Sequence, residues 1–473
     1  MSHASASENR ARSTKTRVFA ATALAWAALT CSTEAFANGR YPAAQHVLIG
    51  PGPAAEAIVL RNTFGFLLSR DAGQSFGWVC EGALGYGGEF DPPFALDASG
   101  RVHFGLYDGL VRATPDTCGV ERLGLFEGEN VVDLDNHPSG ASIVALSVTP
   151  FVSGGPTPVA RIYRSEDGGS SYALVGSISG VLLETLEHAP SSASRVYLAG
   201  ASAPPSRPIV YRSDDGGASS VELAQAWPPD VERLFVAGVD PSDEDTVFLR
   251  ATLKPSSGKS TAIFRSRDGG ASFEELLRTN GPALGFAISA DGEEVWVGSP
   301  SDGLSKSANG GDDFSLVRGD AVRCLRHHEG VLYVCGGPPQ GTPMLGRSID
   351  GGATVSALVS SCTIDGVAAC ESASSPVAQC AASWPQVGSL LPCIEPGEGG
   401  GGQGGQGGDD TPVDSGGAGG ADATSAAGGE APAERRSSDG SCAIRPWGGA
   451  SAELALSCLG VLALARRRRR ARP

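Results

Sequence analysis

The sequence predicts an all-β fold, a seven-bladed β-propeller, on three observations. A phrase of the form Ser-x-Asp-x-Gly-x-Ser/Thr-aromatic recurs along the chain, and the clear copies each follow a short apolar run. The third positions of the seven copies are separated by 45, 51, 48, 53, 41 and 41 residues. An interval of this size holds the four strands and the turns of one propeller blade. An apolar run before a turn phrase is typical of two strands that meet in a tight turn.

The seven copies differ in completeness. Three are complete and begin at Ser69, Ser165 and Ser266, whereas three others lack the aspartate or the closing aromatic residue. The seventh, residues 114–118, is a remnant, so closure by six blades stays open as an alternative. The residues predicted to hold the turns from the third position are Asp71, Asp167, Asp215, Asp268, Asn309 and Asp350.

The chemistry of the phrase explains a structural role. An aspartate can accept hydrogen bonds from backbone amides two residues on, the glycine can adopt positive φ, and the aromatic residue starts the next strand. The phrase resembles the Asp-box, or BNR, repeats of sialidases, tandem-propeller xyloglucanases, sortilin-type receptors and photosystem assembly factors. The resemblance covers residues 45–358. It implies that the repeat residues lie at blade edges away from a central cleft, and it is specific for fold rather than for activity.

The first 37 residues predict a signal peptide that precedes the propeller, residues 38–360. A twelve-residue, mostly apolar run at 18–29 is followed by small residues that favour cleavage after Ala37. A lipoprotein that uses Cys31 is the alternative, although Thr30 stands where a smaller residue is expected. Four basic residues come before the apolar run: Arg10, Arg12, Lys15 and Arg17.

Eight cysteines remain after those of the two chain ends are set aside, and an even number in an exported chain predicts four disulfides. Cys324 and Cys335 flank a predicted hairpin and are expected to pair. Cys80 and Cys118 follow the first two copies of the phrase and are expected to link neighbouring blades. The other four predict a small disulfide-rich cap, residues 361–396, packed on the last blade: Cys362, Cys370, Cys380 and Cys393.

The C-terminal part of the chain predicts a tether and an anchor. Residues 397–440 are mostly Gly-rich and polar, as in flexible linkers. Residues 441–473 contain Cys442, a mostly apolar run of nineteen residues at 447–465 and then an arginine cluster, so a short transmembrane helix is expected. This order resembles the MYXO-CTERM sorting tag, which implies recognition by a membrane protease and delivery to the cell surface. A plain membrane anchor is the alternative.

Composition limits the partners. The formal net charge of −16 disfavours nucleic acid, whose binding relies on basic patches. Only 6% of the residues are aromatic, which favours protein partners over an extended sugar-stacking surface. No Cys-x-x-Cys pair is present, and His327 and His328 would point to opposite faces of a strand. We therefore expect no metal site and no cofactor.

Enzymes of the resembling families need residues that this sequence does not show. The resemblance implies that a sialidase would carry an Arg-Ile-Pro segment and three arginines that bind a carboxylate, and no Arg-Ile-Pro is present. No Gly-x-Ser-x-Gly phrase in strand-to-helix context and no phosphate-binding loop appear either. The arginines that stand directly before a repeat serine are assigned to the repeat: Arg164, Arg212, Arg265 and Arg347.

A glycoside hydrolase would need two carboxyl groups that face each other across the central cleft, about 5–10 Å apart. Asp133 and Asp135, near His137, are candidates, but we expect them in a solvated loop between blades. The acidic group at 240–245 is expected to form the turn before a second strand.

These inferences predict an exported, cell-surface-anchored propeller that binds an envelope protein or an extracellular polysaccharide without catalysis. The alternative is a secreted glycoside hydrolase that acts on a neutral polysaccharide. A structural envelope component without a binding cleft is a third interpretation.

Overall fold

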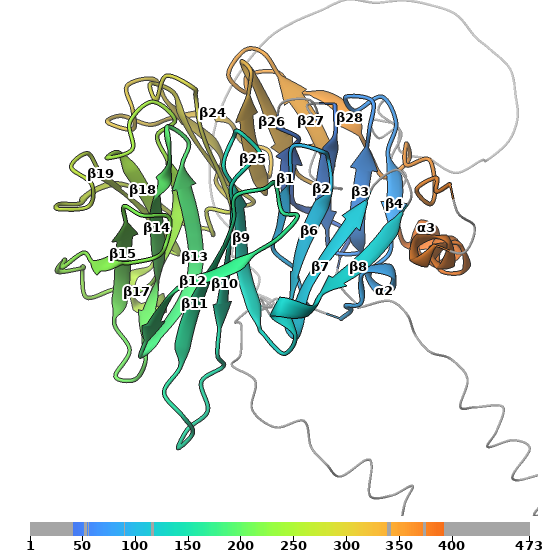
Figure 1. Cartoon of the computed structure of the whole chain (residues 1–473). Helices are drawn as coiled ribbons and strands as arrows, with labels where there is room; N and C mark the ends of the chain where they lie inside the picture. The colour runs from blue at the N-terminus through green and yellow to red at the C-terminus, as the bar shows by residue number, and fades with distance from the viewer. Residues whose placement is uncertain are drawn as a thin grey trace, which may run out of the picture. The chain divides into compact units, whose positions relative to one another are not determined.

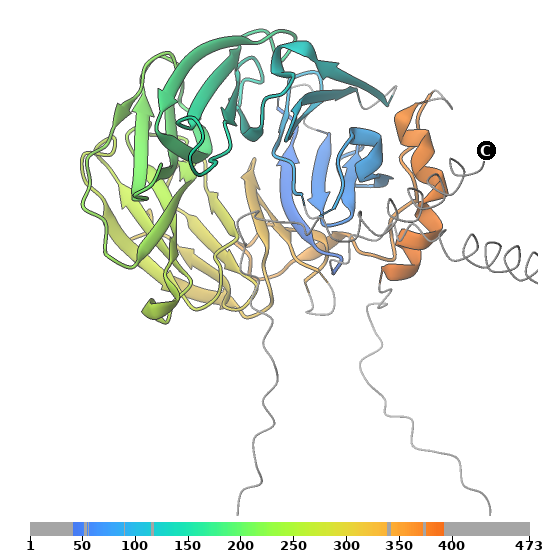
Figure 2. The ribbon, with the colours of Figure 1, turned by 90° about the horizontal axis from the view of Figure 1, so that it is seen from below.

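The computed structural model of the chain confirms the all-β fold and the count of seven blades. It describes residues 41–391 except 52–53, 55, 89, 115–117, 338–341 and 372–374. These residues belong to one compact unit, Met1–Gly401. They form seven four-stranded antiparallel sheets arranged in a ring (Figure 1; Figure 2). The remnant copy of the phrase belongs to a complete blade, so the six-bladed alternative is wrong.

Each blade is a meander of four consecutive strands. Blade 1 contains β1 (Ala44–Ile49), β2 (Ile58–Asn62), β3 (Gly65–Ser69) and β4 (Gly77–Val79). Blade 2 contains β5 (Phe94–Leu96), β6 (Val102–Leu106), β7 (Gly109–Thr114) and β8 (Gly119–Leu123). Blade 3 contains β9 (Val131–Asn136), β10 (Ile143–Val148), β11 (Val159–Ser165) and β12 (Ala173–Ser179). Blade 4 contains β13 (Val181–Ala189), β14 (Ser192–Ser202), β15 (Pro208–Ser213) and β16 (Val221–Glu222).

The other three blades repeat this order. Blade 5 contains β17 (Val231–Val239), β18 (Val247–Leu253), β19 (Thr261–Ser266) and β20 (Glu274–Thr279). Blade 6 contains β21 (Gly285–Ile288), β22 (Val295–Ser299), β23 (Gly303–Ser307) and β24 (Ser315–Arg318). Blade 7 contains β25 (Cys324–His328), β26 (Val331–Cys335), β27 (Leu345–Ser348) and β28 (Ser356–Val359). The helices are short: α2 (Glu81–Leu84), η2 (Gly124–Phe126), η3 (Pro255–Ser257), η4 (Pro376–Ala382) and α3 (Trp384–Leu390).

The strand order places the connections on two opposite faces. The first strand of each blade lies at the centre of the ring (Figure 2). We call the side where these first strands begin the channel face; it carries the blade-to-blade connections and the turns between second and third strands. We call the opposite side the turn face; it carries the turns between first and second strands and the repeated Ser-x-Asp-x-Gly turns.

The apolar core lies between neighbouring sheets. The second strand of blade 3, β10, is buried along its whole length because both of its faces meet another sheet. Val144 and Leu146 of this strand share an apolar cluster with Leu183 and Leu198 of blade 4. Burial on both faces explains why the middle strands read as short, nearly continuous apolar runs in the sequence.

The repeated turns are closed by their own side chains. In blade 3 the hydroxyl of Ser165 accepts a hydrogen bond from the amide of Gly169 (2.8 Å), and Asp167 accepts one from the amide of Ser171 (2.9 Å). The aspartate thus accepts from the amide four positions further on, whereas the sequence predicted the amide two positions on. The reason is that Gly168 and Gly169 both have positive φ, 65° and 75°, which turns the chain back toward the carboxylate.

The arginine before a repeat serine braces the next blade. Arg212 of blade 4 donates to the carbonyl of Gly269 in the repeat turn of blade 5 (2.9 Å). Arg265 of blade 5 donates in the same way to the carbonyl of Gly310 in blade 6. These bonds give a structural reason for the recurrence of arginine at this position.

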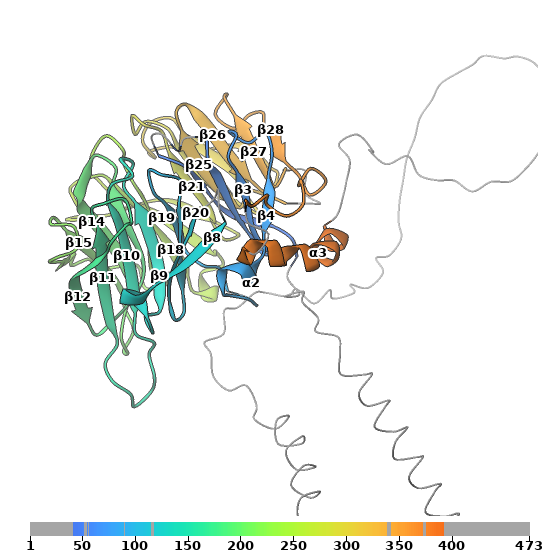
Figure 3. The ribbon, with the colours of Figure 1, turned by 45° about the vertical axis from the view of Figure 1, so that its right-hand side comes forward.

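The disulfides differ from the expected pattern. Cys324 and Cys335 are bonded and are register partners on β25 and β26. Cys80, however, bonds Cys380, and Cys118 bonds Cys370, so the expected link between Cys80 and Cys118 is wrong. The expected position of the cap is also wrong. The C-terminal segment, residues 361–391, packs on blades 1 and 2 rather than on blade 7 (Figure 3). Ring closure places the first blades beside the last one, and local spacing in the sequence does not reveal this.

Several predictions concern parts of the chain outside the described residues. These are the signal peptide with Ala37, the tether, Cys393, and the sorting tag with Cys442. Within the described part of the chain, no helix is long and apolar enough to cross a membrane.

Candidate functional site

A cavity of about 300 Å³ lies at the centre of the ring, and all seven blades contribute to its wall. Several of its lining residues stand at or near the beginning of the first strand in blades 1, 2, 6 and 7, and in the middle or second half of the longer first strands of blades 4 and 5. Examples from blades 1, 2, 6 and 7 are His46, Phe94, Phe286 and Cys324. We call this space the central cavity.

Two carboxylates of the central wall bridge neighbouring blades. Asp133 accepts a hydrogen bond from the amide of Leu186 (2.8 Å), and Asp135 accepts one from the amide of His188 (2.9 Å). Both aspartates lie on β9, the first strand of blade 3, and their partners lie on β13 of blade 4. The expectation of a solvated loop is therefore wrong. First strands of adjacent blades share no ladder of backbone hydrogen bonds, and these side chains connect them instead.

Glu187 of β13 completes an acidic group with the two aspartates. Burial, followed by the nearby Asp135 and Asp133, raises the pKa of Glu187 well above its usual value, and Glu187 hydrogen-bonds to Asp135. Burial raises the pKa of Asp133 to about 7. A carboxyl group that is buried beside another carboxylate keeps its proton. This part of the wall therefore holds protons at neutral pH.

Basic residues occupy other parts of the same wall. Burial, with Arg61 and Arg326 nearby, lowers the pKa of His46 to about 3, so its imidazole is neutral. Arg61 donates to the carbonyl of Pro92 (2.9 Å). Arg250 donates to the carbonyl of Ala283 (3.1 Å), and its guanidinium lies 4.6 Å from the ring centre of Phe235. Each arginine thus bonds a backbone carbonyl in the connection that leads to the next blade.

The carboxyl groups do not have the arrangement of a glycosidase pair. Glu187 lies close enough to Asp135 and Asp133 for both to raise its pKa, so the three carboxyl groups form one cluster rather than a pair that faces across a bound sugar. Asp133 and Asp135 also accept backbone hydrogen bonds, which commits their oxygens to structure. The geometry supports a bridge between blades rather than acid and base catalysis.

The remaining candidates from the sequence lie away from the central cavity. His137 is in the turn after β9, where its ring contacts the hydroxyl of Ser139 (2.9 Å). His327 stacks on Trp296 with ring centres 5.4 Å apart. Asp240 accepts from the amide of Ser242 (2.7 Å) in the turn between β17 and β18. Among the described residues, no group of three or more His, Cys, Asp or Glu side chains is placed to hold a metal ion.

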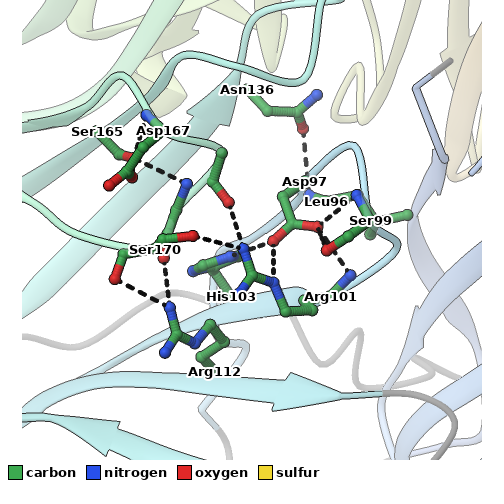
Figure 4. A network of polar contacts seen from close by, with 12 residues as sticks. Leu96, Asp97, Ser99, Arg101, His103, Arg112, Asn136, Ser165, Asp167 and Ser170 are labelled. Carbon is green, nitrogen blue, oxygen red and sulfur yellow. Dashed lines mark hydrogen bonds and ion pairs between the residues drawn. The ribbon is translucent and has the colours of Figure 1, made fainter. Parts of the chain in front are cut away.

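A buried polar chain between blades 2 and 3 did not emerge from the sequence. Asp97 contacts His103 Nε2 (3.2 Å) (Figure 4). On the other side of the ring, His103 Nδ1 contacts the hydroxyl of Tyr172 (3.1 Å). Burial lowers the pKa of His103 and raises the pKa of Tyr172, so both side chains are uncharged at neutral pH, and their polar atoms are paired with each other. A histidine inside the apolar strand β6 was the signal that could have revealed it.

The same chain supports the repeat turn of blade 3. Asp97 pairs with Arg101 (2.6 Å), and Arg101 donates to the carbonyl of Gly168 (2.8 Å). Arg112 donates to the carbonyl of the next residue, Gly169 (2.6 Å) (Figure 4). Arg101, Arg112 and the His103–Tyr172 contact therefore connect blades 2 and 3, while Asp97 orients Arg101 and His103 within blade 2, and we assign the network a structural role.

Exposed apolar side chains gather on the channel face. Six of the eleven exposed large apolar side chains of the described residues lie in its turns and connections, with exposed fractions from 39% to 60%. Tyr107, one member of this group, packs against Phe90 with the two ring centres 4.0 Å apart. We call the six the apolar rim: Tyr41, Tyr107, Leu125, Phe151, Val152 and Leu284.

The chain has no match among protein-family models, and none among curated proteins. Among solved structures it is similar to YCF48 bound to D1 peptide, with 15% identity, a TM-score of 0.43, and coverage of 66% of this chain and 93% of that chain. It is also similar to Kuenenia stuttgartiensis hydrazine synthase, with 10% identity, a TM-score of 0.45, and coverage of 64% and 95%. A third is TolB from Acinetobacter baumannii, with 15% identity, a TM-score of 0.37, and coverage of 66% and 67%. The seven sheets establish the fold independently of these similarities.

Proposed function

We propose that the protein is an exported, surface-anchored Asp-box propeller that binds an envelope protein through its channel face without catalysis. One observation carries this proposal: the six exposed side chains of the apolar rim lie on the channel face, and one of them, Leu284, also lines the central cavity. Exposed apolar groups concentrated around a cavity are typical of interaction surfaces rather than of free surface.

The chemistry of the apolar rim favours protein over glycan. Leu125, Val152 and Leu284 are aliphatic, and they offer contact area to another protein but no ring face to a sugar. Tyr107 and Phe90 form an aromatic pair that would suit either partner. The longest described turn of the channel face, residues 149–158, carries both Phe151 and Val152, so it presents an apolar tip.

The proposed location rests on the sequence. Residues 1–37 would direct export, residues 397–440 would act as a tether, and the tag at 441–473 would deliver the protein to the cell surface. Replacement of Cys442 by serine tests this part: the protein should then stay in the inner membrane fraction or be lost to the medium. Unchanged surface labelling of the variant would contradict the assignment of Cys442.

The binding function is tested with the whole exported protein on envelope vesicles of the producing cell and on a glycan array. Phe151→Ser combined with Val152→Ser should weaken vesicle binding by about tenfold or more, as expected when anchor residues of an interface are lost. Leu174→Ser combined with Val221→Ser is the matched control, because both residues are exposed but lie on outer strands. Equal binding by the two variants would refute the channel face as the binding surface. Saturable binding to a polysaccharide, with release of reducing ends, would instead support the hydrolase alternative.

A further inference from the structure

We propose that the C-terminal segment, residues 361–391, is a covalent lock that holds the ring closed between blades 7 and 1. The property concerns the mechanics of the propeller, and it does not depend on the proposed partner. It rests on the connectivity of the blades, the pairing of the segment with β4, and the positions of two disulfides.

The junction between blades 7 and 1 differs from the other six. Consecutive blades elsewhere are joined by the chain itself, which leaves a fourth strand and enters the next first strand. Blade 7 consists only of β25–β28 and blade 1 only of β1–β4, so no strand exchange fastens the two ends of the ring. Among the described residues, one backbone hydrogen bond joins the two blades near the centre, from the amide of Ala44 to the carbonyl of Gly336 (3.2 Å).

The C-terminal segment begins just after β28 of blade 7 and attaches to β4 of blade 1. The backbone amide of Trp78 donates to the carbonyl of Gly366 (2.7 Å), and the amide of Ala368 donates to the carbonyl of Trp78 (2.9 Å). The two chains form a parallel bridge between Trp78 and Val367. The segment therefore extends the sheet of blade 1 at its outer edge and links that edge to blade 7.

This attachment buries a side chain that its counterparts leave exposed. Trp78 is 2% exposed and lies 5.4 Å from the ring centre of Trp384 in α3. The residues two positions after the repeat aromatic in blades 3 and 6, Leu174 and Leu316, are 52% and 63% exposed. The difference arises because the C-terminal segment covers this position in blade 1 and is absent from blades 3 and 6. Burial of this tryptophan adds an apolar contribution to closure.

The disulfides make the attachment covalent across the whole ring. Cys80–Cys380 joins residues 300 positions apart, and Cys118–Cys370 joins residues 252 positions apart. The first loop encloses blades 2–7 and the second encloses blades 3–7. Cys324–Cys335, with a separation of 11, fixes one hairpin only. Long loops restrict the unfolded chain most strongly, so these two bonds oppose opening of the ring.

A pulling force applied to the chain beyond residue 391 would act on Cys380 before it acts on β28, because Cys380 lies between the two along the chain. Its disulfide to Cys80 would pass the load to blade 1, which leaves β28 at the outer edge of blade 7 unstressed. This consequence matters if the protein hangs from a C-terminal tether, as the proposed function states, but the lock itself is tested without a partner or a membrane.

The experiment cuts the link after the protein has folded. A site for a specific protease is inserted between Ser360 and Ser361 of the full chain, with all cysteines kept. The matched control has the same insertion between Ser256 and Ser257, in the exposed connection from β18 to β19. Hydrogen exchange of backbone amides is measured before and after cutting. On a gel without reductant the cut fragment should stay attached, because the two long disulfides hold it.

Cutting at 360 should speed exchange of β25–β28 by about tenfold or more while β9–β20 stay unchanged, because local opening exposes only the released blade. Unchanged exchange in blade 7, or the same response to the control cut, would overturn the proposal. A second comparison uses paired Cys→Ser variants. Loss of both long disulfides should speed exchange at β1 and β25 together, and loss of Cys324–Cys335 should affect only β25 and β26. If the variant without the two long disulfides does not fold, the test rests on the exchange of blade 7 in the protein cut at 360, which keeps all of its cysteines.

Discussion

Replacement of Asp133 by asparagine should stabilise the protein at alkaline pH and leave it almost unchanged at acidic pH. The carboxyl of Asp133 has its pKa raised from 3.8 to about 7 by burial in the central wall. The folded protein therefore binds a proton that the unfolded chain loses between these two values. Wild-type stability falls as pH rises through this window and is level above it.

The size of the effect follows from the shift. A difference of roughly three pKa units corresponds to about 4 kcal/mol of destabilisation at pH 8, with 1.36 kcal/mol per unit. Asparagine removes this ionisation, and its carbonyl can still accept from the amide of Leu186, as Asp133 does now. The second acceptor contact, with the amide of Leu134 (3.0 Å), is lost and costs about 1 kcal/mol. The net gain at pH 8 is then about 3 kcal/mol.

Denaturant unfolding followed by tryptophan fluorescence measures this difference at pH 5 and pH 8. At pH 5 the expected gain is below about 1 kcal/mol, since most of the titration window lies above that pH. Glu232→Gln is the control, because this carboxyl is exposed on β17. A stability difference between Asp133→Asn and wild type that is equal at both pH values would refute the assignment of a retained proton to Asp133.

Three further outcomes are expected. Gly77→Val should lower the melting temperature and shift tryptophan emission to longer wavelength, because a Cβ there would lie 2.5 Å from the backbone of the C-terminal segment. Unchanged emission would contradict this contact. Arg265→Ala should cost about 2–3 kcal/mol of unfolding free energy, because its side chain is 1% exposed and bonds the next blade, whereas Arg267→Ala, at 52% exposure, should cost less than about 1 kcal/mol. Peptide mapping without reductant should recover Cys362 bonded to Cys393, and a free thiol at either position would exclude the fourth disulfide.

Sequence reasoning was successful where the structure repeats. The spacing of the Ser-x-Asp-x-Gly phrase predicted one blade per copy, and the remnant at 114–118 still marked a complete blade. The recurrence of arginine before the repeat serine was recognised, but its partner was not. That partner, the glycine carbonyl of the following turn, lies about fifty residues further on in the chain, and only the ring arrangement brings the two together.

Sequence reasoning was less successful where the ring closes or where its centre is polar. Cys80 and Cys118 are bonded to cysteines 300 and 252 positions further along the chain, and no local sequence pattern indicates pairing over such separations. Asp133 and Asp135 alternate with apolar residues as strand residues do, yet acidic residues near a histidine suggested a solvated loop. The central wall accepts them because the amides of the neighbouring first strand would otherwise have no partner there.

The separation of the two faces has a consequence for how this propeller can change. The arginine-to-glycine braces between blades lie on the turn face, whereas the connections on the channel face range in length from one residue after β12 to fourteen after β4. Residues can therefore be added to or removed from the channel face without displacing an arginine from its glycine carbonyl. The repeat braces thus stay in place on one face while connections of the other face can change in length, apart from those whose carbonyls bind Arg61 and Arg250.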